Sequence, residues 1–401
     1  MPVKEEPHHE VVIGATRITL LGTAHISRAS AEQVRRLIEG GGYDAVAVEL
    51  CRNRYGAITD PKALSRLDLF SVIRTGRVYM VVANLALAAY QQRLAEQLRI
   101  EPGAEQRVAI RLAKEHGIPV LLVDREIGVT LKRISAGLGW WKRYTLFAGI
   151  FAALLSSEEV SEEDVERLKD GDVLETAFAE LAEDRRGLYG PLIEERDRYM
   201  AAKLRLEVAR DRQAGKGRNI LAVVGLGHLE GIAGHLENDR EPPESVLAAL
   251  EQVPPPSRLP SLIPWTILAL IVGGLAWGFI RSPALGWELM GTWILVTGGL
   301  CALGTLIAGG HPLTVVCGFL AAPLTTLHPA IGAGMVTGAV ELTLRKPRVG
   351  DFGRLREDVS HLGGWWRNRV ARVFVVFILS SLGAAIGTYV GGLRIADRLI
   401  G

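Results

Sequence analysis

The chain has 401 residues, 48% of them hydrophobic, and a mean hydropathy of +0.20. That composition excludes a simple disordered protein. The formal net charge of +2 hides two unlike parts: residues 1–255 contain 34 Lys/Arg and 38 Asp/Glu, whereas residues 256–401 contain 12 and 6. The first part is therefore slightly acidic, with a net charge of −4. The second part is apolar and has a net charge of +6. Its basic residues lie between apolar segments, so they do not indicate nucleic-acid binding.

The cysteines and the amino-terminal residues indicate in which cellular compartment residues 1–255 lie. The cysteines, Cys51, Cys301 and Cys317, show no metal-type spacing, and we expect no disulfide framework. The first residues contain no apolar core typical of a secretory signal. We therefore expect residues 1–255 to lie in the cytoplasm, with an extracellular position as the alternative.

In the first part, short β-branched segments alternate with longer helical patterns. Strands are predicted at residues 17–21, 45–48, 120–123 and 220–224, and helices at about residues 27–39, 78–98, 103–115, 172–186 and 192–213. This alternation predicts an α/β domain whose mixed or parallel sheet has helices on both faces. Residues 128–215 form a long, mainly helical insertion in this scheme. The apolar segment at residues 145–155 is too short to span a bilayer, and we expect it to touch the membrane or to lie in the core.

The second part is predicted to be an all-α, multi-pass transmembrane domain. Uncharged runs at about residues 262–280, 289–308 and 373–393 are 19, 20 and 21 residues long, which matches the thickness of a bilayer core. Tryptophans near their ends suit the membrane interface. Glycines at positions 298, 299, 304, 383 and 387 are predicted to let helices approach closely.

Residues 311–342 are also uncharged until Glu341, but they are broken by Pro323 and Pro329. We predict a broken or re-entrant hairpin here. The following loop, residues 345–372, holds eight Lys/Arg against three acids, which favours the cytoplasmic side. With a hairpin, residues 1–255 lie on that same side; with a single crossing, they lie outside.

Polar residues in the apolar part have two interpretations. One interpretation of His311 and His328 is an ion path in a transporter, but histidines beside prolines are more often helix-terminal. Glu288 and Glu341 are expected at helix ends that water reaches.

Two predicted strands end in the same motif, two apolar residues followed by Gly-x-x-His. It occurs at Gly22 with His25 and at Gly225 with His228. Glu49 directly follows another buried strand. Because the carboxyl ends of parallel strands meet at one edge of a sheet, His25, Glu49 and His228 are predicted to form a divalent-metal site. Each of them alone is more often a turn, capping or ion-paired residue.

A nucleotide-binding loop is the competing interpretation of Gly225-x-Gly227. The third glycine of the dinucleotide motif is replaced by Glu230, and no Walker lysine is present. We therefore favour the metal site.

The sequence also resembles the TraB/PrgY group of the TraB, Tiki and GumN superfamily over nearly its whole length. The motifs that carry the resemblance are Gly-Thr-Ala-His25, Val-Glu49-Leu-Cys-Arg-Asn-Arg54-Tyr, Val-Asp124-Arg125-Glu, Glu195-Arg196-Asp197-Arg-Tyr-Met200-Ala and Gly225-Leu-Gly-His228. The fold that this resemblance implies is related to erythromycin-esterase and ChaN-like domains. Similarity to Tiki-type members implies a peptidase dependent on Mn²⁺ or Co²⁺. Similarity to PrgY-type members implies pheromone shutdown, the control of a peptide signal, which does not require proteolysis.

These observations predict a membrane-anchored, metal-dependent hydrolase that acts on peptides, with Zn²⁺ as a further candidate ion. His25 and His228 would bind the ion, and Glu49 would either complete the ligand set or accept a proton from water. Arg54 would stabilise an oxyanion or bind a substrate carboxylate.

Arg125 and Arg196 are reserve candidates for the role of Arg54, or else members of structural ion pairs. Cys51 is expected to be a buried filler. The alternatives to a hydrolase are a peptide-binding regulator without turnover and a transporter. The expected partners are a peptide or protein and the lipid bilayer, not nucleic acid; a homo-oligomer stays open.

Overall fold

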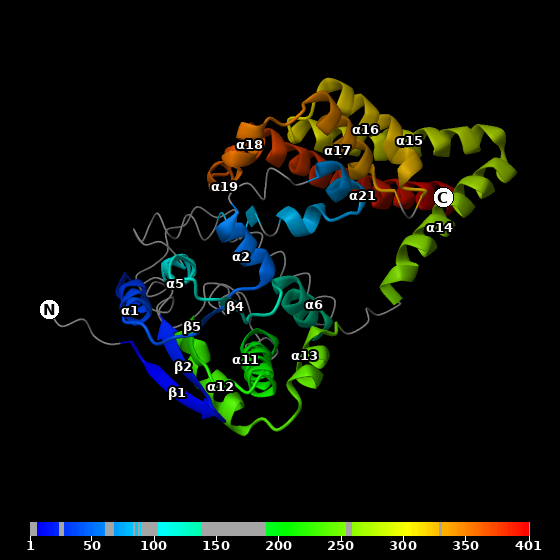
Figure 1. The fold of residues 1–401 in the computed structure, drawn as a ribbon. Coiled ribbons are helices and arrows are strands. Elements are labelled where there is room, and N and C mark those ends of the chain that lie inside the picture. The colour runs from blue at the N-terminus through cyan, green and yellow to red at the C-terminus, as the bar shows by residue number, and fades with distance from the viewer. Residues whose placement is uncertain are drawn as a thin grey trace. The chain divides into compact units, whose positions relative to one another are not determined.

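The computed structural model describes residues 6–23, 28–60, 68–82, 85–86, 89, 103–137, 190–253, 259–328 and 331–400 (Figure 1). Contacts divide the chain into two compact units. The first unit comprises Met1–Pro61 with Arg93–Pro256, and the second comprises Lys62–Gln92 with Ser257–Gly401.

The first unit is built on a five-stranded mixed sheet with the order β1-β2-β5-β3-β4. Only β1 runs antiparallel to its neighbour, and the other pairs are parallel. The strands are β1 (His8–Ile13), β2 (Thr16–Thr23), β3 (Ala45–Val48), β4 (Val120–Leu122) and β5 (Asn219–Gly225). The four predicted strands are confirmed. β1 was not predicted, because it is an edge strand whose side chains are mostly exposed and which therefore lacks a buried apolar run.

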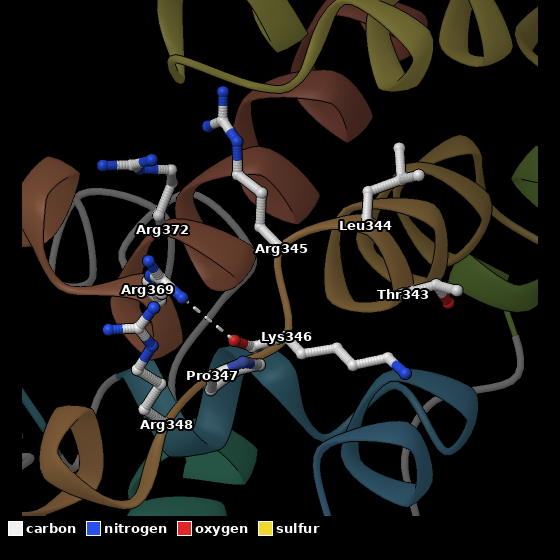
Figure 2. Close-up of a pocket in the computed structure, with 8 residues that line it drawn as sticks. All are labelled: Thr343, Leu344, Arg345, Lys346, Pro347, Arg348, Arg369 and Arg372. Atoms are coloured by element: carbon white, nitrogen blue, oxygen red, sulfur yellow. Dashed lines mark hydrogen bonds between the residues drawn. The ribbon is translucent and has the colours of Figure 1, made fainter.

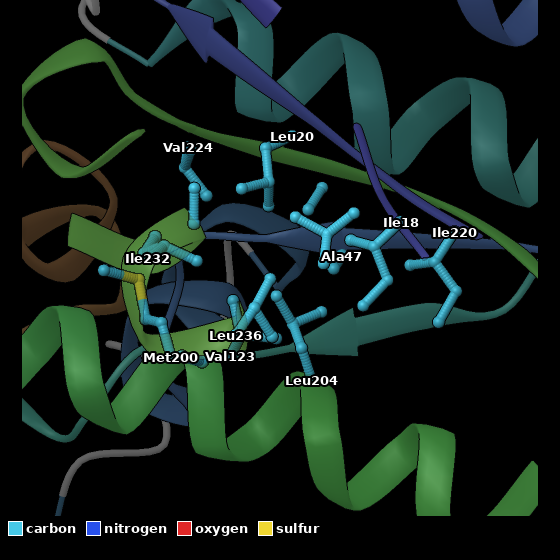
Figure 3. Close-up of a cluster of buried hydrophobic side chains, with 14 of the residues drawn as sticks. Ile18, Leu20, Ala47, Val123, Met200, Leu204, Ile220, Val224, Ile232 and Leu236 are labelled. Carbon is cyan, nitrogen blue, oxygen red and sulfur yellow. The ribbon is translucent and has the colours of Figure 1, made fainter. Parts of the chain in front are cut away.

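Alternate residues of the central strands face opposite sides of the sheet, and both sides are apolar. Ile220, Ala222 and Val224 of β5 contribute to one core, whereas Leu221 and Val223 contribute to the other. Because successive strand residues point to opposite faces, a continuously apolar strand must be covered on both. Figure 3 shows the first core, in which Ile220 and Val224 of β5 lie with residues from two helices.

Helices cover both faces of the sheet, as predicted. The first face is covered by α11 (Glu195–Gln213), through Met200 and Leu204, and by α12 (Leu226–Asn238), through Ile232 and Leu236. The second face is covered by α1 (Arg28–Glu39) and α5 (Ala104–Glu115). In the described part of this unit, the further helices are α2 (Arg52–Thr59), α6 (Ile127–Gly137), the π-helical turn η2 (Gly190–Glu194) and α13 (Pro243–Glu251). The helix predicted at residues 172–186 and the apolar segment at 145–155 lie outside the described residues.

The second unit is helical. Its described helices include α3 (Leu69–Arg74), α14 (Leu259–Arg281), α15 (Pro283–Ile307), α16 (Pro312–Thr325), α17 (Ala333–Leu344), α18 (Val349–Gly353), α19 (Leu355–Asp358), α20 (Gly364–Arg367) and α21 (Arg369–Ile400). Among the described residues, α15 and residues Arg369–Leu399 of α21 are long and apolar enough to cross a membrane. By length and composition alone, two such helices are weak evidence of membrane association.

The uncharged stretch that we predicted to be broken forms two short helices, α16 and α17. Pro323 lies inside the last turn of α16, and Gly332 precedes α17. The two helices contact one another. The stretch therefore forms two helices, whereas a re-entrant hairpin and its position relative to a bilayer stay predictions.

Glycines allow the close approach of helices in this unit. A Cβ atom at Gly298 would meet the backbone oxygen of Phe319, and one at Gly304 would meet that of Leu379. Gly383 and Gly387 of α21 lie equally close to the backbone of α15. The prediction is thus confirmed for these four positions, but Gly299 faces open space.

The second unit also includes an earlier part of the chain. Leu69, Val72 and Ile73 of α3 lie in one core with Leu342 and Phe374. Val78, Val82, Leu85 and Ala89, from the helix predicted at 78–98, belong to the same core. An apolar segment far from the carboxy-terminal helices in sequence thus becomes buried among them.

The polar residues of the apolar part behave differently from one another. His311 is the N-cap of α16 and accepts a hydrogen bond from the Leu313 amide, as a helix-terminal histidine should. Glu288 is half exposed and pairs with Arg398. The expectation of water at Glu341 was wrong. Its side chain is 1% exposed, accepts hydrogen bonds from the His311 amide and the Thr314 hydroxyl, and pairs with Arg345.

Candidate functional site

The candidate site begins at the carboxyl ends of β2, β3 and β5. Thr23, the last residue of β2, pairs with Gly225, the last residue of β5. Glu49 follows β3, and its amide donates a hydrogen bond to the Val223 carbonyl of β5. Its carboxylate also accepts a hydrogen bond from the Gly225 amide at 2.6 Å. The parallel sheet therefore brings Glu49 and the second Gly-x-x-His motif to one edge, as predicted.

The two motif glycines with described surroundings have different roles. At Gly22, a Cβ atom would lie 3.1 Å from side-chain carbons of both Leu226 and Leu229, so a small residue lets α12 pack on β2. Gly225 is the N-cap of α12 and supplies the amide that binds Glu49. Gly227 is the second residue of α12.

His228 lies in the first turn of α12 and is 1% exposed. Its Nδ1 atom is 2.5 Å from Oδ1 of Asp197, which lies in the first turn of α11. Its Nε2 atom is buried, has no hydrogen-bond partner among the described residues, and is 3.6 Å from Oε1 of Glu49. A histidine held by a carboxylate on one nitrogen while the other nitrogen stays open is the arrangement of many metal ligands.

Arg196 links Glu49 to a second carboxylate. Its Nη2 atom donates to Glu49 Oε1 at 2.8 Å, and its Nε and Nη2 atoms donate to the two carboxylate oxygens of Asp124 at 3.1 Å each. Asp124 follows β4 by two residues. The guanidinium is 3% exposed. Arg196 thus fixes two strand-end carboxylates.

Arg54, the predicted oxyanion-stabilising residue, lies on α2. Its guanidinium is 3.8 Å from Oδ2 of Asp124, and its side chain is 39% exposed. It therefore lies near the same carboxylate as Arg196 but also reaches solvent.

The charges of this cluster are nearly all buried. Three carboxylates, from Glu49, Asp124 and Asp197, are at most 8% exposed. Burial by itself lowers the pKa of His228, but the charge of Glu49 and the hydrogen bond that the imidazole donates to Asp197 outweigh it and raise the pKa above its ordinary value. The site therefore favours a positive charge beside these carboxylates.

Arg125 lies in a separate ion-pair network. It is fully buried and donates to Glu195 at 2.8 Å, to the Thr130 hydroxyl and to the Leu250 carbonyl. Arg133 binds the same carboxylate at 2.7 Å. These contacts join α6, α11 and α13, which agrees with the structural interpretation of Arg125.

Cys51 and His25 are the remaining residues that the sequence singled out. Cys51 is buried as the N-cap of α2, and burial raises the pKa of its thiol, as expected for a filler. His25 lies outside the described residues. Among the described residues, no group of three or more His, Cys, Asp and Glu is placed to hold a metal ion.

Sequence reasoning missed the roles of Asp124 and Asp197. Both stand in the motifs that carry the family resemblance, beside Arg125 and Arg196. Five consecutive charged residues, Glu194 to Arg198, surround the start of α11, and their order does not show which of them faces the sheet.

Comparisons with known proteins agree with the motifs. Residues 8–246 match the family model described as TraB/PrgY/gumN family, and residues 259–400 match the model described as TraB family protein, C-terminal domain. The chain belongs to the TraB/PrgY/gumN family.

One relative is an uncharacterized protein of Methanocaldococcus jannaschii, which is 32% identical over 382 residues. The match covers 93% of this chain and 93% of the relative. A TraB domain-containing protein of Bos taurus is 31% identical over 66% of this chain and 72% of its own length. The Homo sapiens TraB domain-containing protein is 31% identical over 60% and 67%, respectively.

Proposed function

We propose that this protein is a membrane-anchored, metal-dependent hydrolase that acts on peptides. The observation that carries the proposal is the Nε2 atom of His228, which is buried, lacks a hydrogen-bond partner among the described residues, and faces the Glu49 carboxylate at 3.6 Å. A buried polar atom without a partner costs free energy, about 1–3 kcal/mol. A ligand at this position would remove that cost.

The chemistry of the donors fits a divalent cation. His228 would bind it through Nε2 with Glu49 as a second ligand, and His25, two residues beyond the end of β2, is the proposed third. When bound, such an ion supplies Lewis-acid activation of water and of a carbonyl oxygen. Mn²⁺ or Co²⁺ is favoured by the family resemblance, and Zn²⁺ by the ligand types.

The other residues would orient and bind. Asp197 fixes the imidazole of His228 through Nδ1, so that Nε2 points toward Glu49. Arg196 holds the Glu49 carboxylate in place. Arg54, which is partly exposed, would bind a substrate carboxylate or the developing oxyanion.

Anchoring in a membrane is part of the same proposal. The support is α15 and α21, which are long and apolar enough to cross, together with the basic loop at residues 345–372. Under the charge rule, that loop lies in the cytoplasm.

A peptide-binding regulator without turnover is the second candidate. Both oxygens of the Glu49 carboxylate already accept hydrogen bonds, from Arg196 and from the Gly225 amide. A carboxylate held in this way can be structural. A transporter gains no support from His311, because its imidazole caps α16.

The deciding experiment uses the full chain in detergent with a peptide library and Mn²⁺, Co²⁺ or Zn²⁺. Metal-dependent cleavage that His25→Ala, His228→Ala and Glu49→Gln each abolish, and that His235→Ala on the same helix leaves intact, would support the hydrolase. Metal binding without cleavage would favour the regulator. Absence of both would refute the metal site.

A further inference from the structure

The second unit contains a pocket of about 730 Å³ whose charged lining residues are all basic. Figure 2 shows it at the junction between the end of α17 and the start of α21. The lining residues are Thr343, Leu344, Arg345, Lys346, Pro347, Arg348, Arg369 and Arg372.

Two of these arginines have no carboxylate partner among the described residues. Arg369 donates a hydrogen bond to the Lys346 carbonyl at 3.4 Å, and Arg372 donates to the Trp366 carbonyl at 2.6 Å. Each guanidinium has five N–H groups, so these contacts fix its position while leaving donors for a ligand. Both side chains are partly buried.

Arg345 is fixed differently. It pairs with the buried Glu341 at 3.2 Å and donates to the Gly309 carbonyl at 2.7 Å. Glu341 offsets the charge of Arg345. The other four basic side chains of the lining belong to Lys346, Arg348, Arg369 and Arg372, and the lining contains no acidic residue. In Figure 2 the ammonium group of Lys346 points away from Arg369 and Arg372.

Gathering like charges in one pocket costs free energy unless an anion neutralises them. Phosphate suits the arrangement because its oxygens accept several hydrogen bonds and guanidinium groups bind it in a bidentate manner. Leu344 and Pro347 add apolar surface to the wall.

The position of the pocket indicates two sources for such a group. It lies where the apolar helices α17 and α21 meet the basic loop. If α21 crosses a membrane, this is the depth of lipid headgroups, and basic pockets there bind anionic lipids. A free phosphate compound from solution has the same recognition chemistry.

We propose that this pocket binds a phosphate group, carried either by an anionic lipid headgroup or by a soluble phosphate compound. Arg369 and Arg372 provide the principal contacts, and Arg348 adds charge at the rim. The site is separate from the cluster around His228 and does not depend on the proposed hydrolase activity.

The test uses the full chain with two probes. Inorganic phosphate is titrated against the protein in a zwitterionic detergent. In parallel, the protein is placed in nanodiscs of phosphatidylcholine with and without phosphatidylglycerol, and bound lipid is measured by native mass spectrometry. Replacement of Arg369 and Arg372 by Gln is expected to weaken binding of at least one probe about tenfold or more, with a reduced dependence on salt.

The matched control is Arg356→Gln, which removes the same charge from an exposed position of the same loop outside the pocket. It should leave binding unchanged. Because Arg372 also contacts Trp366, the double variant Arg348→Gln with Arg369→Gln serves as a second test that keeps this contact, and circular dichroism verifies the fold.

The two probes separate the sources. Phosphatidylglycerol binding that depends on the arginines assigns the site to lipid headgroups, and arginine-dependent binding of inorganic phosphate alone assigns it to a soluble ligand. Binding of neither probe, or binding that the Arg356→Gln control weakens equally, would overturn the proposal.

Discussion

The Nε2 atom of His228 lies 3.6 Å from Oε1 of Glu49, and both side chains are 1% exposed. This separation is too long for a hydrogen bond. Two donors bound to one ion at about 2.0–2.2 Å each lie at most about 4.4 Å apart, so the separation is compatible with a shared ion. His228 and Glu49 come from different strand ends, and the parallel pairing of β3 with β5 makes them neighbours.

The first prediction concerns metal affinity. His228→Ala is expected to reduce the affinity for Mn²⁺ or Zn²⁺ at least a hundredfold, because it removes a ligand. Asp197→Asn should reduce it about 10- to 100-fold, since it loosens the orientation of the imidazole. Isothermal titration calorimetry would measure the metal affinity of both variants, with His235→Ala as the control. Unchanged affinity in His228→Ala would exclude His228 as a ligand.

A second prediction uses two glycines of α12. A Cβ atom at Gly231 would collide with the carboxylate of Asp197, whereas one at Gly234 would meet nothing within 4 Å. Gly231→Ala should therefore displace Asp197 from His228, lower metal affinity about tenfold or more, and destabilise the first unit by about 1–3 kcal/mol. Gly234→Ala should keep metal affinity and gain about 0.5–1 kcal/mol from helix propensity. Equal behaviour of the two variants in calorimetry and thermal unfolding would contradict this packing.

Stability toward acid should depend on Glu195. Burial raises its pKa, but hydrogen bonds from Arg133 and Arg125 outweigh this effect and lower the pKa below its ordinary value of 4.5. Stabilisation by this carboxylate is therefore present at neutral pH and is lost as the pH falls through the lowered folded-state pKa. Glu195→Gln should cost about 1–3 kcal/mol at pH 7, because Arg125 stays buried, and the difference from the original chain should shrink in strong acid.

Thermal unfolding of both forms over a series of pH values measures this effect. Glu115→Gln changes the same charge at an exposed position and should have little effect. A pH-independent difference for Glu195→Gln would mean that packing, and not the ion pairs, is responsible.

The contact between α15 and α21 should depend on Gly304. A methyl group there would collide with the Leu379 carbonyl, but one at Gly299 faces open space. Gly304→Ala is expected to destabilise the helical unit by about 1–3 kcal/mol, and Gly299→Ala should not. Denaturation in detergent followed by far-ultraviolet circular dichroism would compare them, and equal stability of both variants would contradict a backbone-to-backbone contact at Gly304.

The sequence by itself determined the elements whose signals are local. A continuously apolar run predicted β5 and its burial on both faces, and prolines predicted the break between α16 and α17. Glu49 and the Gly-x-x-His motif at His228 were placed at one sheet edge because parallel strands share a direction. The third member of that prediction, His25, is still a prediction.

Only the tertiary structure decided the pairings. Arg196 binds Glu49 across 147 residues, and Asp197, not a sequence neighbour, orients His228. Glu341 was expected in water, yet it is buried because α16 begins against it and its carboxylate accepts the His311 amide. Periodicity and turn signals involve residues that are close in sequence. The contacts named above depend on which helices and strands become neighbours in space, and a local sequence pattern does not predict this.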